Sequence, residues 1–405
     1  MPDNSHSHDV WVSQLNARPE IRGAFARRQP VRFYDTTLRD GEQTVGVVLS
    51  PQQKLEIARQ LDALGISRIE AGFPRVSADD AEAIRLLSAA GLKAELWGFS
   101  RAVQADLEEL LRLGVRATII EAPTSEIKLQ AYGISCAEVL RRVRDAIRFA
   151  RQNGITVAFF AVDGTRTELE FLKQVYLAAL EAGAAELVVV DTIGACGPEA
   201  AEFLTCEVCA WAGAGFPVHW HGHNDFGLGT ASAIAAVRGG ATWVQGTING
   251  MGERAGNADI CEIALALRCL YDVPVAMDLT RVREVSQIVC QAAGYQLEAW
   301  KPLVGENLFT RESGAVASQF HIPEAIEPYS AALVGAERRI VLGKKSGLDS
   351  IALKARELRL QVPAESRAAI LAEVKKRAIA KRGLLTDAEF RQIVAGVAPQ
   401  KAATP

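Results

Sequence analysis

Residues 31–65 read VRFYDTTLRDGEQTVGVVLSPQQKLEIARQLDALG, and this stretch has the pattern of one complete β-strand and α-helix pair. The β-rich run VRFYDT opens it, a polar turn follows, and a segment with helical periodicity closes it. Ser50 and Gly65 flank that segment, and these residue types are preferred at the N-terminal and C-terminal ends of helices. We therefore predict a strand, a polar loop and a helix, in this order.

The same alternation continues to about residue 275. Eight β-rich runs occur in all, at residues 31–36, 67–72, 93–99, 115–122, 155–162, 185–192, 217–223 and 242–249. Eight strand–helix units of this length fit an α/β fold of the (β/α)8 TIM-barrel type. A doubly wound open sheet is the alternative, but no GxGxxG motif for a dinucleotide follows the first strand.

The pattern also predicts a division of the chain. We expect an N-terminal arm over residues 1–30 and a TIM-barrel catalytic domain over residues 31–277. Beyond residue 277 the pattern changes to helical stretches with intervening loops. We expect a linker subdomain over residues 278–335 and a C-terminal, mainly helical subdomain with a tail over residues 336–405.

Composition narrows the class of protein. The chain has 405 residues, 49% hydrophobic and 23% charged, with a net charge of −3, so neither nucleic acid nor an anionic membrane surface is an expected partner. No apolar run is long enough to cross a membrane, and the N-terminus lacks a signal-peptide pattern. Seven dispersed cysteines do not resemble a disulfide framework, and a cytoplasmic location is expected.

His219, His221 and His223 alternate in the motif HWHGHND, although the whole chain has only six histidines. Side chains two residues apart in a strand share one face, so the three imidazoles point the same way. Two of them can reach one metal ion, with Asp40 as a carboxylate ligand and Asn257 as a source of an amide oxygen. Such a mixed set suits Mg, Mn, Co or Zn.

Polar motifs follow six of the predicted strands. They are DTTLRDGEQ, EAGFP, APTS, DTIG, HWHGHND and NGMGERAGN. Because the active site of such a barrel lies at the C-terminal ends of its strands, these motifs are expected to meet there.

Three of the motifs carry a family resemblance. DTTLRDGEQ (35–43), HGHNDFGLGTASAIAAVRGGA (221–241) and GTINGMGERAGNADICEIALAL (246–267) resemble those of the DRE-TIM metallolyase superfamily. The likeness is to its Claisen-condensing branch, which holds homocitrate synthase, 2-isopropylmalate synthase and citramalate synthase. LGKKSG (342–347) extends the likeness, and the length of the chain suits the shorter homocitrate synthases.

The resemblance implies roles for individual residues. Asp40, His221 and His223 match metal ligands, and Asn257 lies near the same ion in the family. Arg39 matches a residue that stabilises the enolate oxygen formed from acetyl-CoA. Positions that line the family's substrate pocket are matched by Gln43, Glu70, Arg101, Ser125 and Thr192. His219 falls outside the ligand pair, and we expect it to support the ligands or to contact the substrate.

The chain departs from the family pattern at three positions. Val316 stands where the synthases usually carry a catalytic histidine that acts in the neighbouring subunit. His321, with Tyr329 behind it, is the candidate for that role. Val162 replaces a glutamate of the fifth strand. Ala158 replaces the arginine with which lysine-pathway homocitrate synthases hold the distal carboxylate of 2-oxoglutarate.

The resemblance therefore implies a homodimeric, metal-dependent acyltransferase that condenses acetyl-CoA with a 2-oxo acid, with 2-oxoglutarate favoured. Synthases that make isopropylmalate-, citramalate- or phosphonomethylmalate-type products are alternatives. A hydroxyacyl-CoA lyase or aldolase on the same scaffold is another, although NGMGERAGN lacks the cysteine of the lyase loop. A non-catalytic paralogue is the last alternative, because the usual histidine and glutamate are both absent.

Overall fold

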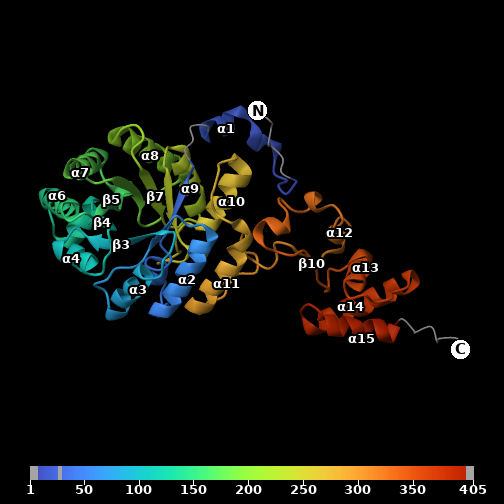
Figure 1. Cartoon of the computed structure of the whole chain (residues 1–405). Helices are drawn as coiled ribbons and strands as arrows, with labels where there is room; N and C mark the ends of the chain where they lie inside the picture. The colour runs from blue at the N-terminus through green and yellow to red at the C-terminus, as the bar shows by residue number, and fades with distance from the viewer. Residues whose placement is uncertain (1–7, 26–29, 398–405) are drawn as a thin grey trace. The chain divides into compact units, whose positions relative to one another are not determined.

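The computed structural model describes residues 8–25 and 30–397, and these residues form two compact units. The barrel unit runs from Ser13 to Gln296. The C-terminal unit combines the described residues of Met1–Val12 with those of Leu297–Pro405. In Figure 1 the barrel unit runs from blue to yellow, and the helices of the C-terminal unit are orange and red. Residues 1–7 and 26–29 of the predicted N-terminal arm and residues 398–405 of the predicted C-terminal tail lie outside the described residues.

Eight parallel strands form a closed barrel in chain order, β1 to β8, and the predicted (β/α)8 fold is confirmed. Residues 32–35 of β1 pair with residues 243–246 of β8 and close the ring. Each predicted β-rich run coincides with one strand, although β3 extends two residues and β4 one residue beyond the predicted run. The strands are β1 (Arg32–Asp35), β2 (Arg68–Glu70), β3 (Glu95–Arg101), β4 (Ala117–Pro123), β5 (Thr156–Val162), β6 (Glu186–Asp191), β7 (Val218–Gly222) and β8 (Trp243–Gly246).

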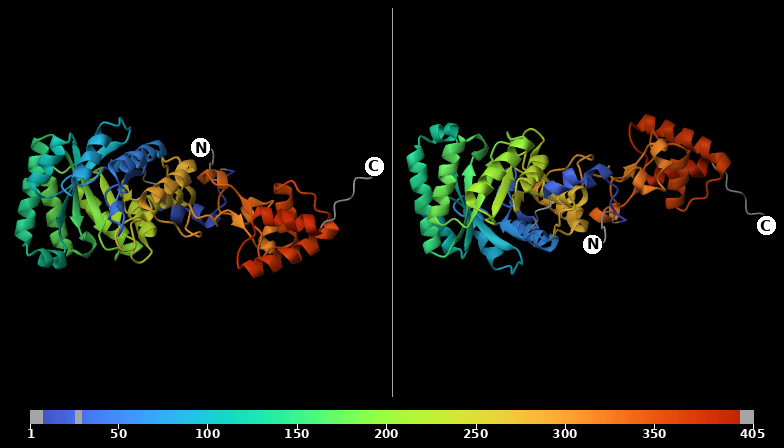
Figure 2. Two further views of the ribbon diagram at one scale, coloured as in Figure 1. Left: turned by 90° about the horizontal axis from the view of Figure 1, so that it is seen from below. Right: turned by 90° about the horizontal axis from the view of Figure 1, so that it is seen from above.

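Helices surround these strands, as both views in Figure 2 show. The first long helix begins at Pro51 after Ser50, whose hydroxyl accepts from the Gln53 amide in a capping box, and it ends at Gly65 in the left-handed conformation. The helices of this unit are α1 (Pro19–Arg22), α2 (Pro51–Leu64), α3 (Ala78–Ser88), α4 (Gln104–Arg112), α5 (Glu126–Tyr132), α6 (Cys136–Gln152), α7 (Leu169–Ala182), α8 (Pro198–Ala212), α9 (Gly229–Arg238), α10 (Ile260–Tyr271) and α11 (Val282–Ala293).

The barrel unit extends beyond residue 277, where the sequence pattern placed the end of the catalytic domain. Helix α11 packs against α2 and belongs to the barrel unit, so the boundary lies after Gln296. At the other end, Phe25 of the predicted arm stacks on Tyr271 of α10, with ring centroids 4.3 Å apart. The barrel unit is therefore longer than the predicted catalytic domain at both ends.

Alternate residues of the strands fill the barrel interior. Tyr34, Trp97, Phe99, Phe160 and Trp243 form a buried, aromatic-rich cluster with smaller side chains from β4, β5 and β6. Because inward and outward positions alternate with a period of two, polar residues that continue these series also point inward. The interior is therefore filled by side chains. The polar residues among them are the candidates for contact with a substrate.

The C-terminal unit has its own core. Its helices are α12 (Gly314–Ala317), α13 (Leu348–Glu357), α14 (Arg367–Lys381) and α15 (Asp387–Val397). Ile351, Ile370 and Phe390, each fully buried, lie at the centre of the three longer helices. The predicted linker and helical subdomain are not separate, because β9 (Thr310–Arg311) pairs with β10 (Arg339–Ile340) across that boundary.

Within the described residues, no helix combines the length and apolar character needed to cross a membrane.

Candidate active site

Asp40, His221 and His223 meet inside the barrel, as their strand-end positions predict. The Asp40 Oδ2 atom lies 3.3 Å from His221 Nε2 and 3.8 Å from His223 Nε2. One ligand atom from each residue falls within 4.8 Å of the others, and all three residues are buried. A carboxylate and two imidazoles at this spacing are a suitable set for a divalent metal ion.

Hydrogen bonds fix which imidazole nitrogen faces Asp40. The His221 Nδ1 atom lies 3.1 Å from Gln245 Oε1, and His223 Nδ1 lies 3.1 Å from the carbonyl oxygen of Gly256. Both oxygens are acceptors, so each Nδ1 carries the proton and donates it. With Nδ1 as the donor, the Nε2 of each ring faces the Asp40 carboxylate and is the nitrogen that can offer a lone pair. Lone pairs that face one another in this way favour a cation between them.

Asn257 contributes a further unpaired acceptor. Its Nδ2 donates to the carbonyl oxygen of Met251 at 3.0 Å, whereas its Oδ1 is buried and has no hydrogen-bond partner among the described residues. Asn257 also bridges His223 through the backbone. A buried, unsatisfied amide oxygen beside a metal-ligand triad fits a divalent ion or the water bound to it. The residues present therefore fit the metal that the family resemblance implies.

Arg39 reaches the same region from the loop after β1. Its Nε donates to Glu70 Oε1, and its guanidinium carbon lies 4.0 Å from the centroid of the Phe99 ring. Tyr34 donates to the other Glu70 oxygen at 2.9 Å. Arg39 Nη2 is buried and has no hydrogen-bond partner among the described residues. Glu70 thus holds Arg39 in place and leaves one donor for an oxygen of a ligand.

Burial and charge together set the protonation of this cluster. Burial alone would raise the pKa of Asp40, but Arg39 and the two neighbouring imidazoles outweigh it and lower that pKa. Burial also lowers the pKa of His223, to about 4, which keeps its imidazole neutral. Burial raises the pKa of Glu70, although Arg39 partly offsets this effect. An ionised aspartate and a neutral imidazole are the forms that bind a metal ion.

His219 lies deeper in the barrel than the metal-ligand triad. It is fully buried, its Nε2 lies 2.6 Å from Glu186 Oε2, and its Nδ1 lies 3.2 Å from Gln245 Nε2. Both ring nitrogens are therefore engaged with protein groups. These hydrogen bonds favour the predicted role of a group that supports the ligands over the predicted substrate contact, and both roles stay predictions.

The other predicted pocket residues differ from one another in their exposure and in their hydrogen-bond partners. Arg101 turns toward α4 and pairs with Asp106 at 2.8 Å, with about half of its side chain exposed. The Ser125 hydroxyl donates to Asp163 and caps α5. Thr192 accepts from the backbone amide of Asp163 at 2.7 Å. Gln43 is exposed in the short 3-10 helix η3 (Gly41–Gln43).

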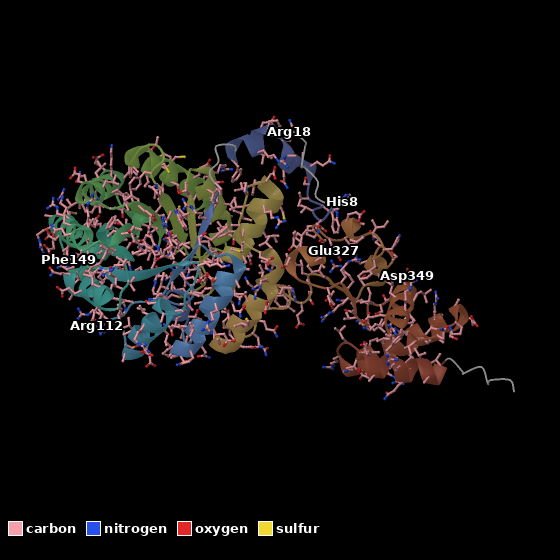
Figure 3. All side chains as sticks on the ribbon, viewed as in Figure 1. His8, Arg18, Arg112, Phe149, Glu327 and Asp349 are labelled. Carbon is pink, nitrogen blue, oxygen red and sulfur yellow. The ribbon has the colours of Figure 1, made fainter. Side chains whose placement is uncertain are left out.

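His321 and Tyr329 belong to the C-terminal unit. His321 is exposed, and Tyr329 is largely buried against the Phe309 ring. The segment that carries His321 is held by Arg338, which donates to the Phe320 carbonyl oxygen at 2.8 Å and pairs with the buried Glu327, labelled in Figure 3.

Tyr34, Gln245 and Glu121 are among the inward-facing residues that the sequence motifs did not indicate. Tyr34 holds Glu70, and Gln245 contacts both His219 and His221. Glu121 follows the inward-facing Ile119 on β4, and burial raises the pKa of its carboxyl group, although Arg39 and Arg101 lie nearby. Polar residues at inward positions of apolar strands would have been the signal for Gln245 and Glu121.

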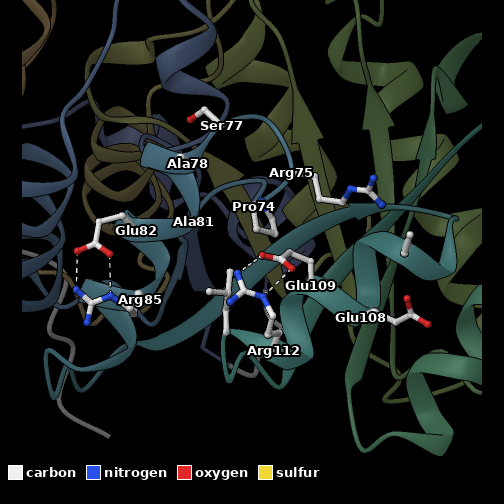
Figure 4. A pocket seen from close by; sticks show the side chains of 12 residues that line it. Pro74, Arg75, Ser77, Ala78, Ala81, Glu82, Arg85, Glu108, Glu109 and Arg112 are labelled. Atoms are coloured by element: carbon white, nitrogen blue, oxygen red, sulfur yellow. Dashed lines mark hydrogen bonds and ion pairs between the residues drawn. The ribbon is translucent and has the colours of Figure 1, made fainter.

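A charged hollow between α3 and α4 lies outside this cluster (Figure 4). Each of its three arginines faces a carboxylate: Arg85 lies 2.5 Å from Glu82, Arg112 lies 2.5 Å from Glu109, and Arg75 lies 3.6 Å from Asp106. Exposed ion pairs of this kind contribute little to stability and do not by themselves mark a binding site.

The sequence profile described as HMGL-like matches residues 30–289, about two thirds of the chain. The chain belongs to the HMGL-like family. A homocitrate synthase of Methanopyrus kandleri is 40% identical to this HMGL-like protein over 91% of the chain and 92% of the relative. The 2-isopropylmalate synthase 2 of Caldanaerobacter subterraneus subsp. tengcongensis is 38% identical, over 91% and 96%. A putative (R)-citramalate synthase of M. kandleri is 40% identical, over 91% and 72%.

These relatives confirm the predicted membership of the Claisen-condensing branch, and the HMGL-like protein is an enzyme of this synthase type. Solved structures agree on the fold. The HMG-CoA lyase of Bacillus subtilis has a TM-score of 0.60 at 21% identity, over 67% of this chain and 96% of that one. The hydroxymethylglutaryl-CoA lyase of Pseudomonas aeruginosa gives 0.60 at 20%, over 66% and 94%. At such identity the likeness concerns the fold alone.

Proposed function

We propose that the protein condenses the acetyl group of acetyl-CoA with a 2-oxo acid. Water then hydrolyses the thioester, which releases CoA and a 2-hydroxy-2-alkyl dicarboxylate, with a third carboxylate when the acceptor is 2-oxoglutarate. The observation that carries this proposal is the pairing of two features. Asp40, His221 and His223 present one carboxylate and two imidazole lone pairs to a common point. Arg39 holds a buried, unpaired donor in the same region.

Asp40, His221 and His223 would hold the metal ion, which would supply a Lewis acid for the keto group of the 2-oxo acid. Arg39 Nη2 then donates to an oxygen that becomes negative, which in this reaction is the enolate oxygen of the acetyl thioester. Glu70 and the Phe99 ring keep the guanidinium at that position before charge develops. Asn257 Oδ1, which has no hydrogen-bond partner among the described residues, would be available to accept a hydrogen bond from the substrate or from water.

Proton transfer at the acetyl methyl group needs a base, and we propose His321 for this role, with Tyr329 as a further catalytic candidate. His321 is exposed, and so it is available to a second subunit. The protein is then a homodimer in which the C-terminal unit of one subunit completes the barrel of the other. Mixed dimers of Arg39→Gln and His321→Ala chains test this directly, since only they can regain one intact site.

The acceptor that we propose first is 2-oxoglutarate. The match to a homocitrate synthase over almost the full length of both chains supports this choice. A 2-oxo acid with an apolar side chain is the second candidate. The inner wall beside the metal-ligand triad supports it, because Phe99 and Phe160 are buried there and the Phe160 ring lies 5.0 Å from the His221 ring. Ala158 adds no cation for a second carboxylate.

Thiol release from acetyl-CoA tests the proposal. Purified protein with Mg²⁺ or Mn²⁺ is assayed against 2-oxoglutarate, 2-oxoisovalerate, pyruvate, oxaloacetate and phosphonopyruvate. We expect one acceptor to release CoA well above the rate without any oxo acid. A protein that releases no CoA with any acceptor, and instead cleaves a hydroxyacyl-CoA, is a lyase, and the proposal fails.

A further inference from the structure

A row of hydrogen-bonded, buried side chains runs through the barrel interior from β2 to the metal-ligand triad. It comprises Arg68 on β2, Glu186 on β6, His219 and His221 on β7, and Gln245 on β8, and none is more than 6% exposed. The successive contacts are Arg68 to Glu186 at 2.6 and 3.0 Å, Glu186 to His219 at 2.6 Å, His219 to Gln245 at 3.2 Å and Gln245 to His221 at 3.1 Å.

Arg68 keeps Glu186 ionised. The guanidinium binds both oxygens of the carboxylate, and it lies between two indole rings, 4.3 Å from the centroid of Trp97 and 3.7 Å from that of Trp243. A bidentate ion pair that is held between two aromatic rings is restricted to one geometry. Glu186 therefore faces His219 as a pure acceptor.

The position of each proton along the row follows from the Arg68–Glu186 ion pair. Because Glu186 accepts, the Nε2 of His219 carries the proton, and Nδ1 is left as an acceptor. Gln245 must then turn its amide NH2 toward His219, which directs its Oε1 at His221. His221 donates its Nδ1 proton to this oxygen, and its Nε2 lone pair is free for a metal ion.

His223 offers a comparison within the same molecule. Its Nδ1 donates directly to the backbone carbonyl oxygen of Gly256, so its tautomer does not depend on the row. The two ligand histidines therefore reach the same ligand-ready form by separate routes, one through the backbone and one through three side chains.

We propose that Glu186, His219 and Gln245 are positioning residues that set the tautomer and orientation of His221. The proposal rests on the metal site of the proposed function, but it does not depend on which reaction that site performs. His219 is then neither a metal ligand nor a substrate contact. It acts on the site through Gln245.

The test is a measurement of imidazole tautomers in the metal-free, full-length protein labelled with ¹⁵N-histidine. The chain has only six histidines, so the signals can be assigned by single substitutions. In wild type we expect His221 to be protonated at Nδ1 and His219 at Nε2. In Gln245→Leu, His221 should lose the fixed Nδ1 proton, whereas His223 should keep its own. In Gln245→Glu, which retains an acceptor, His221 should keep the wild-type form.

Cobalt affinity gives a second readout. Co²⁺ binding to Gln245→Leu should weaken by about 10- to 100-fold, and binding to Gln245→Glu should weaken less. If Gln245→Leu does not fold, a pair of variants at His219 replaces it. His219→Asn keeps an acceptor near the Nδ1 position, whereas His219→Gln keeps a donor toward Glu186 and leaves Gln245 without its acceptor. We expect only the second to disturb His221.

The proposal is overturned if His221 keeps the Nδ1 proton and Co²⁺ affinity stays within about twofold of wild type in Gln245→Leu or His219→Gln. A failure of the metal site looks different. Wild type would then bind no Co²⁺, while the tautomers of His219 and His221 would still respond to Gln245→Leu.

Discussion

The Asp40 Oδ2 atom lies 3.3 Å from His221 Nε2 inside the barrel, and the other ring nitrogen of His221, Nδ1, donates a hydrogen bond to Gln245. An anionic oxygen and a nitrogen lone pair thus face each other in a buried place. This arrangement is costly without a cation, and His223 Nε2, 3.8 Å from the same oxygen, adds a second lone pair. The relationship between Asp40 and His221 is therefore the basis for the metal site.

Replacement of His221 by alanine should abolish tight binding of a divalent ion, because one of three ligands is lost. Isothermal titration of Co²⁺ into the metal-free protein measures this loss. His321→Ala is the matched control, since it removes an exposed histidine of the C-terminal unit, and its affinity should equal that of wild type. Stoichiometric, tight binding by His221→Ala would rule out the proposed ligand set.

Replacement of Arg39 by glutamine should lower kcat by about 10²- to 10³-fold, because a preorganised donor to the enolate oxygen is lost. Metal affinity should change much less, since Arg39 is not a ligand. Steady-state thiol release and Co²⁺ titration separate the two effects. Arg85→Gln removes an arginine that is paired on the outer face of α3 and should leave kcat unchanged. A wild-type kcat in Arg39→Gln would exclude the proposed role.

Replacement of His321 by alanine should lower kcat by about 10²-fold or more if His321 transfers the proton from the acetyl methyl group. The rate is measured at saturating acetyl-CoA and oxo acid, with folding checked by circular dichroism. Ser318→Ala, at an exposed site three residues away, is the control. An unchanged rate in His321→Ala would assign the proton transfer to another group.

Replacement of Gly256 by alanine should weaken both the fold and the metal site. Gly256 has φ +83°, and a Cβ atom there would lie 1.9 Å from the carbonyl oxygen of Gly250. The loop must move, and with it the carbonyl that orients His223. Gly114→Ala is the matched control, because Gly114 has φ +80° and no heavy atom within 4 Å of such a Cβ.

In the Gly114→Ala variant the free energy of unfolding should fall only by the cost of placing alanine in the left-handed conformation, about 1–2 kcal/mol. Thermal unfolding monitored by circular dichroism should show a clearly larger drop in Tm for Gly256→Ala. Equal drops, with normal Co²⁺ affinity in both variants, would contradict this reading of the loop.

Glu186 should make the fold sensitive to acid. Burial alone would raise its pKa, but the hydrogen bond to His219 and the charge of Arg68 lower it to about 2. Because this pKa lies below the value of about 4.5 for an unfolded glutamate, the contribution to stability is complete above about pH 4.5. It is lost as the pH falls toward 2.

Urea unfolding at pH 5 and pH 3 measures this contribution. The midpoint of wild type should fall more between the two pH values than that of Glu186→Gln, which cannot titrate at this position. Parallel losses in the two proteins would assign the acid sensitivity to other carboxylates.

Periodicity explains what the sequence could predict. Strand ends and alternation were enough to predict a barrel and to bring Asp40 together with His221 and His223. They did not separate His219 from the other two histidines, because all three have the same inward direction. A strand rises about 3.3 Å per residue, so His219 and His223 lie about 13 Å apart along it. Three alternate histidines therefore cannot all reach one ion.

Contacts between distant segments explain what the sequence could not predict. The partner of His219 is Glu186, 33 residues away, and the partner of Glu70 is Tyr34, 36 residues away. Neither pair forms a motif. Ser125 matched a family pocket position, yet its hydroxyl caps α5 and donates to Asp163. A short polar side chain after a strand suits both roles, and only the packing distinguishes them.

The most direct test of the central claim follows the methyl carbon of [2-¹³C]acetyl-CoA by NMR, with protein first stripped of metal by EDTA and then given Mg²⁺. With the correct 2-oxo acid, we predict that the label becomes the methylene carbon next to a new quaternary carbinol, and only after Mg²⁺ is restored. If the label remains in acetyl-CoA or appears only as acetate with every acceptor and divalent metal tried, the protein does not form the carbon–carbon bond that its barrel is proposed to make.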